Sequence, residues 1–107
     1  MSSMTSVSFS CSPEQIRIAY KKAFGISVTV PASGNSDVVV GLINTLLGVV
    51  DVKVADPSYT AAYPKGIAWN DQSGLWGITI FAGSGNVLNG RLLGEEVARL
   101  QALMDGV

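Results

Sequence analysis

The stretch from Gly66 to Ala82 constrains the fold of this chain more than any other part of the sequence. Larger apolar residues alternate with other residues on both sides of Asp71-Gln72-Ser73-Gly74, a tetrapeptide that suits a type I turn closed by a glycine with positive φ. Alternation with a period of two places successive side chains on opposite faces of a strand, so the stretch predicts a β-hairpin. Closing the turn at these residues would place Trp69 opposite Trp76, and an aromatic cross-strand pair helps to hold the register.

The second strand of this hairpin carries bulky apolar side chains on both faces. Trp76, Ile78 and Ile80 share one face, whereas Leu75 and Phe81 share the other. Because removal of apolar surface from water stabilises the folded state, we expect this strand to be covered on both sides.

The clearest helix begins after Ser12. Ser12 is a good N-cap, Pro13 fits the first helical position, and Gln15 completes a capping box. Apolar residues then recur at helical spacing until Gly25, which is expected to end the helix.

Other segments supply the remaining elements of an α+β domain. Alternating patterns predict strands at residues 6–10, 26–30 and 50–55, and a loop is expected over residues 56–65. Helical spacing predicts a helix from residue 36 or 37 to about Leu47, and a last helix from about Gly90 to Met104 with Asn89 as its cap. The order β-α-β-α-β-β-β-α predicts a single α+β domain over residues 1–107. We expect a two-layer sandwich, in which a mostly antiparallel sheet of about five strands packs against two to three helices.

Charged residues are scarce in this chain of 107 residues. They make up 14% of the sequence, against about 25% in an ordinary globular domain, whereas hydrophobic residues make up 48%. One interpretation is a neutral surface rich in glycine and serine. The other is that part of the surface is buried against a partner or against other copies of the chain, because charge is depleted at the centres of interfaces.

Charge and hydropathy also exclude several classes of protein. The net charge is −1 and the basic residues are dispersed, so nucleic-acid binding is not expected. The longest apolar run, Val38 to Val50, is shorter than the roughly 20 residues of a membrane-spanning helix. The N-terminus lacks a positive region followed by an apolar core, so we expect no secretory signal there. We expect a cytoplasmic protein or a component of an assembled virion.

The sequence is poorly equipped for catalysis. It contains no histidine, which removes the commonest general base and the commonest metal ligand. Its acidic residues are dispersed, and the adjacent Glu95 and Glu96 would point apart on a helix. We therefore expect no enzyme activity, no catalytic residues, no cofactor and no metal ion. The single cysteine, Cys11, permits no internal disulfide and is interpreted as a packing residue, with a reactive thiol as the alternative.

Residues 85–92 share the placement of a phosphate-binding loop between a strand and a helix. Arg91 stands at the position of the required lysine, and Leu92 at that of the serine or threonine that holds magnesium. We interpret the segment as a turn that leads into a helix, although residues 83–85 could still bind an anion weakly at the helix N-terminus.

The sequence Ser-Pro-Glu-Gln-Ile-Arg-Ile-Ala-Tyr-Lys-Lys-Ala, residues 12–23, resembles the second helix of a J-domain, a co-chaperone module. The resemblance ends at residue 23. J-domains continue into a His-Pro-Asp loop, which a chain without histidine cannot form. Residues 12–23 are therefore interpreted as a generic capped amphipathic helix.

Aromatic residues are the best candidates for contacts with other proteins. Tyr59 and Tyr63 lie in a segment bounded by prolines, and together with Trp69 and Trp76 they form the predicted interface set. Alternatively, both tyrosine rings fold back onto the sheet of their own domain.

Two functions are compatible with these observations. The first is a non-enzymatic structural or assembly subunit that buries surface against other copies or a larger particle. Its most concrete form is a small phage virion component, such as a decoration, head–tail or tail protein. The alternative is a small binding module or an inhibitor of a host protein. Protein partners are expected, as a homo-oligomer or a larger assembly, and neither a nucleic acid nor a membrane is expected as a partner.

Overall fold

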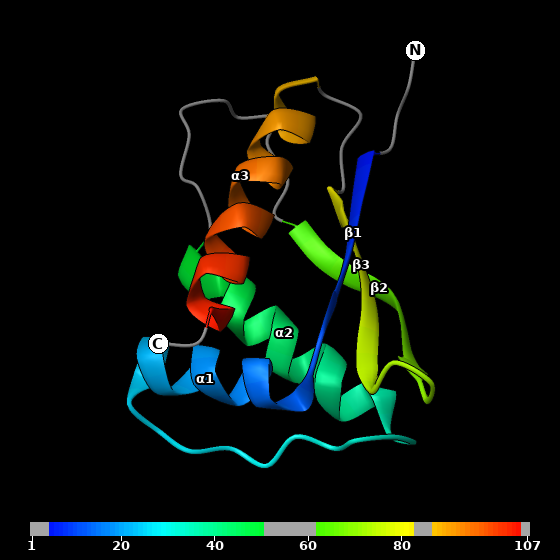
Figure 1. Ribbon diagram of the computed structural model, residues 1–107. Helices are drawn as coiled ribbons and strands as arrows, with labels where there is room; N and C mark the ends of the chain where they lie inside the picture. The colour runs from blue at the N-terminus through cyan, green and yellow to red at the C-terminus, as the bar shows by residue number, and fades with distance from the viewer. Residues whose placement is uncertain (1–4, 51–61, 83–86, 106–107) are drawn as a thin grey trace.

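The computed structural model describes the backbone of residues 5–50, 62–82 and 87–105, and the side chains of residues 6–50, 66–80 and 94–105. The elements are β1 (Thr5–Cys11), α1 (Pro13–Phe24), α2 (Ser36–Val50), β2 (Ala62–Asn70), β3 (Leu75–Ala82) and α3 (Val87–Met104). The described strands form one antiparallel sheet in the order β1-β3-β2 (Figure 1). The predicted α+β class is confirmed.

The helices lie together on one side of this sheet (Figure 1). Helix α2 packs against β2, α3 packs against β1 and β3, and α1 contacts both other helices. The core between them is apolar and draws on every helix and on the sheet. Its buried side chains are Cys11, Ile16, Ala19, Tyr20, Val30, Val39, Ile43, Leu46, Leu47, Val50, Trp76, Ile78, Ile80, Val97, Leu100 and Met104.

The predicted hairpin forms as expected. Gly74 has a φ of 70°, and its amide donates to the carbonyl oxygen of Asn70 over 2.9 Å. The side-chain oxygen of Asn70 also accepts hydrogen bonds from the amides of Gln72 and Ser73, which holds the turn in shape. Trp69 pairs with Trp76 across the hairpin, and their rings meet edge to face with centroids 5.3 Å apart.

Helix α1 begins and ends as the sequence predicts. The Ser12 hydroxyl accepts from the amide of Gln15 over 3.1 Å, and the Gln15 side chain accepts from the amide of Ser12 over 2.9 Å. These bonds form the capping box. Gly25 ends the helix with a φ of 71°, a conformation that glycine adopts without steric cost.

Two predictions between α1 and β2 are wrong. Residues 26–30 form no strand; they follow an extended path beside α1 and α2 (Figure 1), where Val30 is buried in the core. The alternating pattern there reflects packing of an extended segment, without pairing in the sheet. Helix α2 continues beyond Leu47 to Val50, since Val50 extends the buried stripe of the helix instead of starting a strand.

Two element boundaries also differ from the prediction. Strand β2 begins at Ala62, inside the segment expected to be a loop, and it tolerates Pro64 because β2 lies at an edge of the described sheet. Helix α3 begins at Val87, ahead of the predicted start at Gly90. Residues 51–55, the other predicted strand, lie outside the described residues, so the five-stranded two-layer sandwich stays a prediction.

Within the described part of the chain, no helix combines the length and the apolar character that are needed to cross a membrane.

Candidate interaction surface

The face of the sheet that points away from the helices is the candidate surface, which we call the open face. The register of the strands shows which residues belong to the open face, because residues paired across antiparallel strands share a face. Ser8 pairs with Thr79, and Ser10 pairs with Gly77, which also pairs with Ala68. The described residues of the open face are Ser6, Ser8, Ser10, Gly66, Ala68, Asn70, Leu75, Gly77 and Thr79.

This face contradicts the expectation that β3 is covered on both sides. Trp76, Ile78 and Ile80 are buried under the helices, but Leu75, Gly77 and Thr79 on the opposite face are only half-buried. Their neighbours on β1 and β2 are exposed. The prediction gave too much weight to Leu75 and Phe81, because small residues occupy the positions between them.

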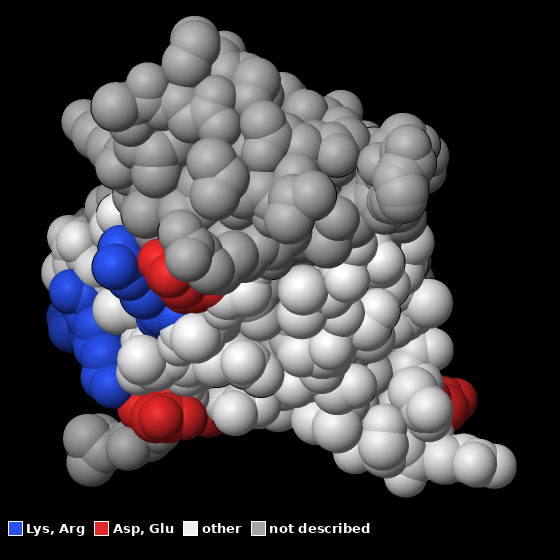
Figure 2. Space-filling view, turned by 90° about the horizontal axis from the view of Figure 1, so that it is seen from above, with Lys and Arg blue, Asp and Glu red and all other residues white. Residues whose placement is uncertain are grey.

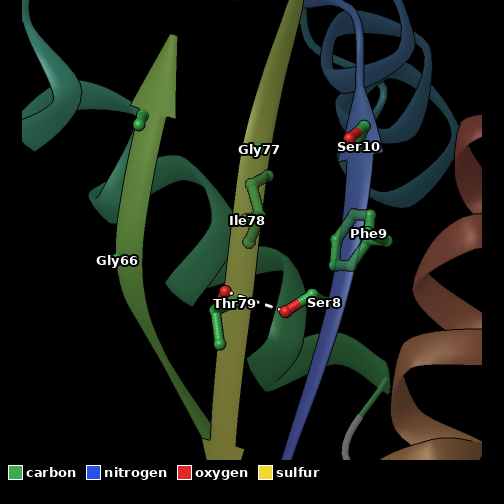
Figure 3. A pocket seen from close by; sticks show the side chains of 8 residues that line it. Ser8, Phe9, Ser10, Gly66, Gly77, Ile78 and Thr79 are labelled. Atoms are coloured by element: carbon green, nitrogen blue, oxygen red, sulfur yellow. Dashed lines mark hydrogen bonds between the residues drawn. The ribbon is translucent and has the colours of Figure 1, made fainter. Parts of the chain in front are cut away.

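A shallow hollow of about 340 Å³ lies at the centre of the open face (Figure 3). Gly66, Ala68, Gly77 and Ser10 provide little side-chain bulk there, so the backbone itself forms part of the surface. The hydroxyls of Ser8 and Thr79 hydrogen-bond to each other over 2.9 Å at one end of the hollow. The surface therefore combines exposed backbone with weakly polar hydroxyl groups.

The fold does not require a glycine at the centre of this hollow. A Cβ atom at Gly77 would meet only the carbonyl oxygen of Ala68 at 3.7 Å, an ordinary van der Waals contact, and Gly77 has no positive φ. A glycine inside a strand costs about 0.5–1 kcal/mol relative to alanine. Such glycines mark a β-bulge, or a site where a ligand or another backbone approaches closely. Gly77 pairs with Ala68, at the end of the register shift in β2. The space beside Gly77 is therefore open to an external contact, although the register shift in β2 also accounts for a glycine at this position.

Charge is distributed unequally between the helices and the sheet. The described basic side chains, Arg17, Lys21, Lys22 and Arg99, all belong to α1 and α3. Figure 2 shows basic groups gathered along one side of the molecule and a broad area without charge beside them. The described side chains of the open face are uncharged, although Lys65 occupies the same cross-strand row as Thr79 and Ser8. The described side chains of the open face thus carry no charge that a neutral partner would have to desolvate.

The two predicted interface tryptophans lie on the opposite, helix-facing side of the sheet. Trp76 is 1% exposed and donates its indole N–H to the carbonyl oxygen of Pro31 over 2.8 Å, so it anchors the segment after α1 to the sheet. Trp69 is half-buried and donates to Asp71 over 2.7 Å. Trp76 offers a partner almost no area, whereas Trp69 keeps some exposed surface.

Of the two predicted interface tyrosines, the structure describes only the backbone of Tyr63. Tyr59 lies outside the described residues. The backbone of Tyr63 belongs to β2 and pairs with Phe81, which pairs with Ser6 of β1. Tyr63 therefore belongs to a strand instead of a loop, and its contact with other chains stays a prediction.

The described residues offer little for chemistry. No three of their cysteine, aspartate and glutamate side chains lie close enough to hold a metal ion. Burial raises the pKa of the Cys11 thiol from 9.0 to about 12, which keeps the sulfur protonated and unreactive. Glu96 is buried in α3 and has an interaction partner within the chain, whereas Glu95 is exposed, so these neighbours form no carboxylate pair.

Comparisons with models of protein families, with curated proteins and with solved structures find no match to this chain. The sequence indicated only the part of the open face that lies on β1, although signals were present in two strands. Serines alternate along residues 6–10, and small residues alternate with large ones along residues 76–80.

Proposed function

We propose that this protein is a non-enzymatic structural subunit that acts by burying its open face against other copies of itself or against a larger particle. The observation that carries this proposal is Gly77, a glycine in the central strand that leaves room for a side chain and yet has none. The uncharged hollow around it supports the same conclusion, because a partner could approach the backbone closely without displacing charge.

A small component of a phage particle, such as a decoration, head–tail or tail protein, is the most concrete form of this proposal. The scarcity of charge in the sequence and the buried, unreactive Cys11 support a structural role over a catalytic one. The expected setting is a particle assembled in the cytoplasm, where a single reduced cysteine is unexceptional.

The test compares two glycine substitutions. Gly77→Val fills the hollow and adds a residue with high strand propensity, so the isolated domain should keep or gain stability while its assembly weakens. Gly94→Ala is the matched control, because Gly94 is exposed on α3 with open space around it. This control should stabilise the helix by about 1 kcal/mol and leave assembly unchanged.

Complex size is measured by light scattering on the untagged protein, followed by affinity capture from its native lysate, and stability is measured by thermal unfolding. Loss of assembly by Gly77→Val alone supports the proposal. Unchanged assembly in Gly77→Val contradicts it. A large loss of stability in Gly77→Val would show instead that the glycine serves the fold.

The hollow also favours a second candidate, a small binding module or inhibitor of a host protein. Its volume of about 340 Å³ is sufficient for one or two side chains of a bound protein. This candidate predicts a monomer in the absence of its target and a complex of fixed stoichiometry in its presence. A protein that assembles without any other component would exclude it.

The interface prediction for Tyr59 and Tyr63 is tested separately. Replacing both tyrosines with serine should weaken assembly by a few kcal/mol and leave the fold intact if the rings are interface anchors. Lower thermal stability of the monomeric double variant would place the rings in the core. Unchanged stability together with unchanged complex size would show that the tyrosines do not belong to the interface.

A further inference from the structure

The two edges of the sheet differ in their protection against pairing with another strand. Edge strands commonly carry a proline, a lysine or a bulge, each of which hinders the addition of a further strand. Strand β2 has all of these features, with Pro64, Lys65 and a register shift between Lys65 and Ala68. Strand β1 has none of them: its sequence is Thr-Ser-Val-Ser-Phe-Ser-Cys, and its register with β3 is continuous from Thr5 to Cys11.

The outer edge of β1 also lacks backbone partners among the described residues. The backbone hydrogen bonds found outside regular helices and strands involve none of residues 5–11. In an antiparallel edge strand, alternate N–H and C=O groups point away from the sheet. A seven-residue strand with these groups unpaired is a template for one more strand.

We infer that β1 pairs antiparallel with β1 of a second copy of this chain, with the two-fold axis at Ser8. The sequence around Ser8 is nearly palindromic, because serines stand at positions 6 and 10 and the apolar residues Val7 and Phe9 flank the centre. This register places Val7 opposite the partner's Phe9, and Ser6 opposite the partner's Ser10. All serines then share one face, and all apolar side chains share the other.

The exposure of Val7 and Phe9 agrees with this register. Both side chains point to the helix-facing side of the sheet, but each is only half-buried and packs at the margin of the core. In the proposed pair, Val7 of each copy would cover Phe9 of the other, which removes apolar surface from water. A foreign strand would need the same alternation of small and apolar residues, whereas a second copy supplies it by symmetry.

This inference deepens the proposed assembly function and rests on it, because it names a second copy of the chain as one partner. Edge pairing would join two sheets of three strands into one continuous sheet. The open faces of the two copies would then lie side by side as one larger surface. No charged residue occurs in β1, so the approach of two identical strands meets no like-charge repulsion at the junction.

Cysteine cross-linking tests the register directly. Directly opposed residues in an antiparallel pair have Cα atoms about 4.5–5.5 Å apart, which lies within the range of a disulfide. Ser8→Cys should therefore form a disulfide-linked dimer on mild oxidation. Ser10→Cys is the matched control, since two copies of residue 10 would stand about 13 Å apart along the strands. Equal cross-linking by both variants, or none by Ser8→Cys, would overturn the inference.

A pair of lysine substitutions separates edge pairing from contact through the open face. Ser8 and Ala68 are both exposed on the open face, but Ser8 lies at the β1 edge and Ala68 lies on β2. In sedimentation at high protein concentration, Ser8→Lys should lower the measured mass from that of a dimer to that of a monomer. Ala68→Lys should leave the measured mass unchanged. Loss of the dimer in both variants would assign the contact to the open face, and a monomeric wild type would also overturn the edge inference.

These outcomes remain distinguishable from failure of the proposed function. If the wild type is monomeric but joins a larger particle in a manner that Gly77→Val abolishes, the assembly function stands and the edge inference fails. If the wild type dimerises through Ser8 and Gly77→Val changes no assembly, the edge inference stands and the open face loses its proposed role.

Discussion

Cys11 lies at the junction between the sheet and the first helix, where β1 ends and Ser12 caps α1. Its side chain is 1% exposed and shares the core with Ile16, at the spacing expected for a hydrophobic staple. The carbon and sulfur atoms of Cys11 thus serve packing, and burial raises the pKa of the thiol to about 12 because the thiolate would lose its hydration. The interpretation of Cys11 as a packing residue agrees with this environment.

Burial of Cys11 leads to a prediction about alkaline pH. The pKa of the thiol is about 12 in the folded protein and 9.0 in the unfolded chain. Stability from this group is therefore complete below about pH 9 and is lost as the pH rises from there toward 12, because the unfolded chain ionises first. Denaturant unfolding at pH 7 and pH 10 should show a larger loss of stability in the wild type than in Cys11→Ala. Equal losses in the two proteins would contradict the prediction.

Trp76 is the residue whose truncation should damage the fold most. It combines full burial, an edge-to-face contact with Trp69 and a hydrogen bond to Pro31. Trp76→Ala should lower the free energy of unfolding by about 3–5 kcal/mol, measured from denaturant midpoints. Trp69→Ala should cost less, because Trp69 is only half-buried. A denaturant midpoint near the wild type for Trp76→Ala would show that the hairpin does not organise the core.

At the scale of elements, α1 is held both by a cap within its own sequence and by contacts with the other helices. The capping box between Ser12 and Gln15 closes the first turn of the helix. The Tyr20 hydroxyl donates to the carbonyl oxygen of Leu42 in α2 over 3.0 Å. Ser12→Ala should therefore cost about 1 kcal/mol of stability in thermal unfolding. Ser73→Ala, at an exposed position of the hairpin turn, is the control and should be nearly neutral. A neutral Ser12→Ala would mean that tertiary packing alone fixes the start of α1.

The elements that could be predicted from sequence are those with local signals. The turn at residues 71–74, the cap at Ser12 and the end at Gly25 depend on residue types within a few positions, and all were predicted correctly. Residues 26–30 and Val50 were assigned wrongly because alternating or apolar residues pack equally well in an extended segment, a strand or a helix. Tertiary contacts decide between these states. The part of the open face on β3 was missed for a related reason, since sequence does not show which face of a strand the helices cover.

At the scale of the whole molecule, the described charged side chains lie on or directly beside the helices and in the hairpin turn, and those of the strands are uncharged. Association through the open face or the β1 edge should therefore depend little on ionic strength. Salt that shortens the Debye length from about 30 Å to about 3 Å should leave the measured mass of the assembly unchanged. Sedimentation velocity at low and high salt provides the measurement. Dissociation at high salt would assign the contact to the basic groups of α1 and α3 instead.

The edge-to-face contact between Trp69 and Trp76 has an optical consequence. Two indole rings held with centroids 5.3 Å apart in a fixed, chiral orientation couple their electronic transitions. The far-ultraviolet circular dichroism of the folded protein should thus contain an exciton couplet on top of the backbone signal. Because these are the two tryptophans of the chain, the couplet reports on the hairpin alone, and its disappearance can be timed separately from the melting of the helices.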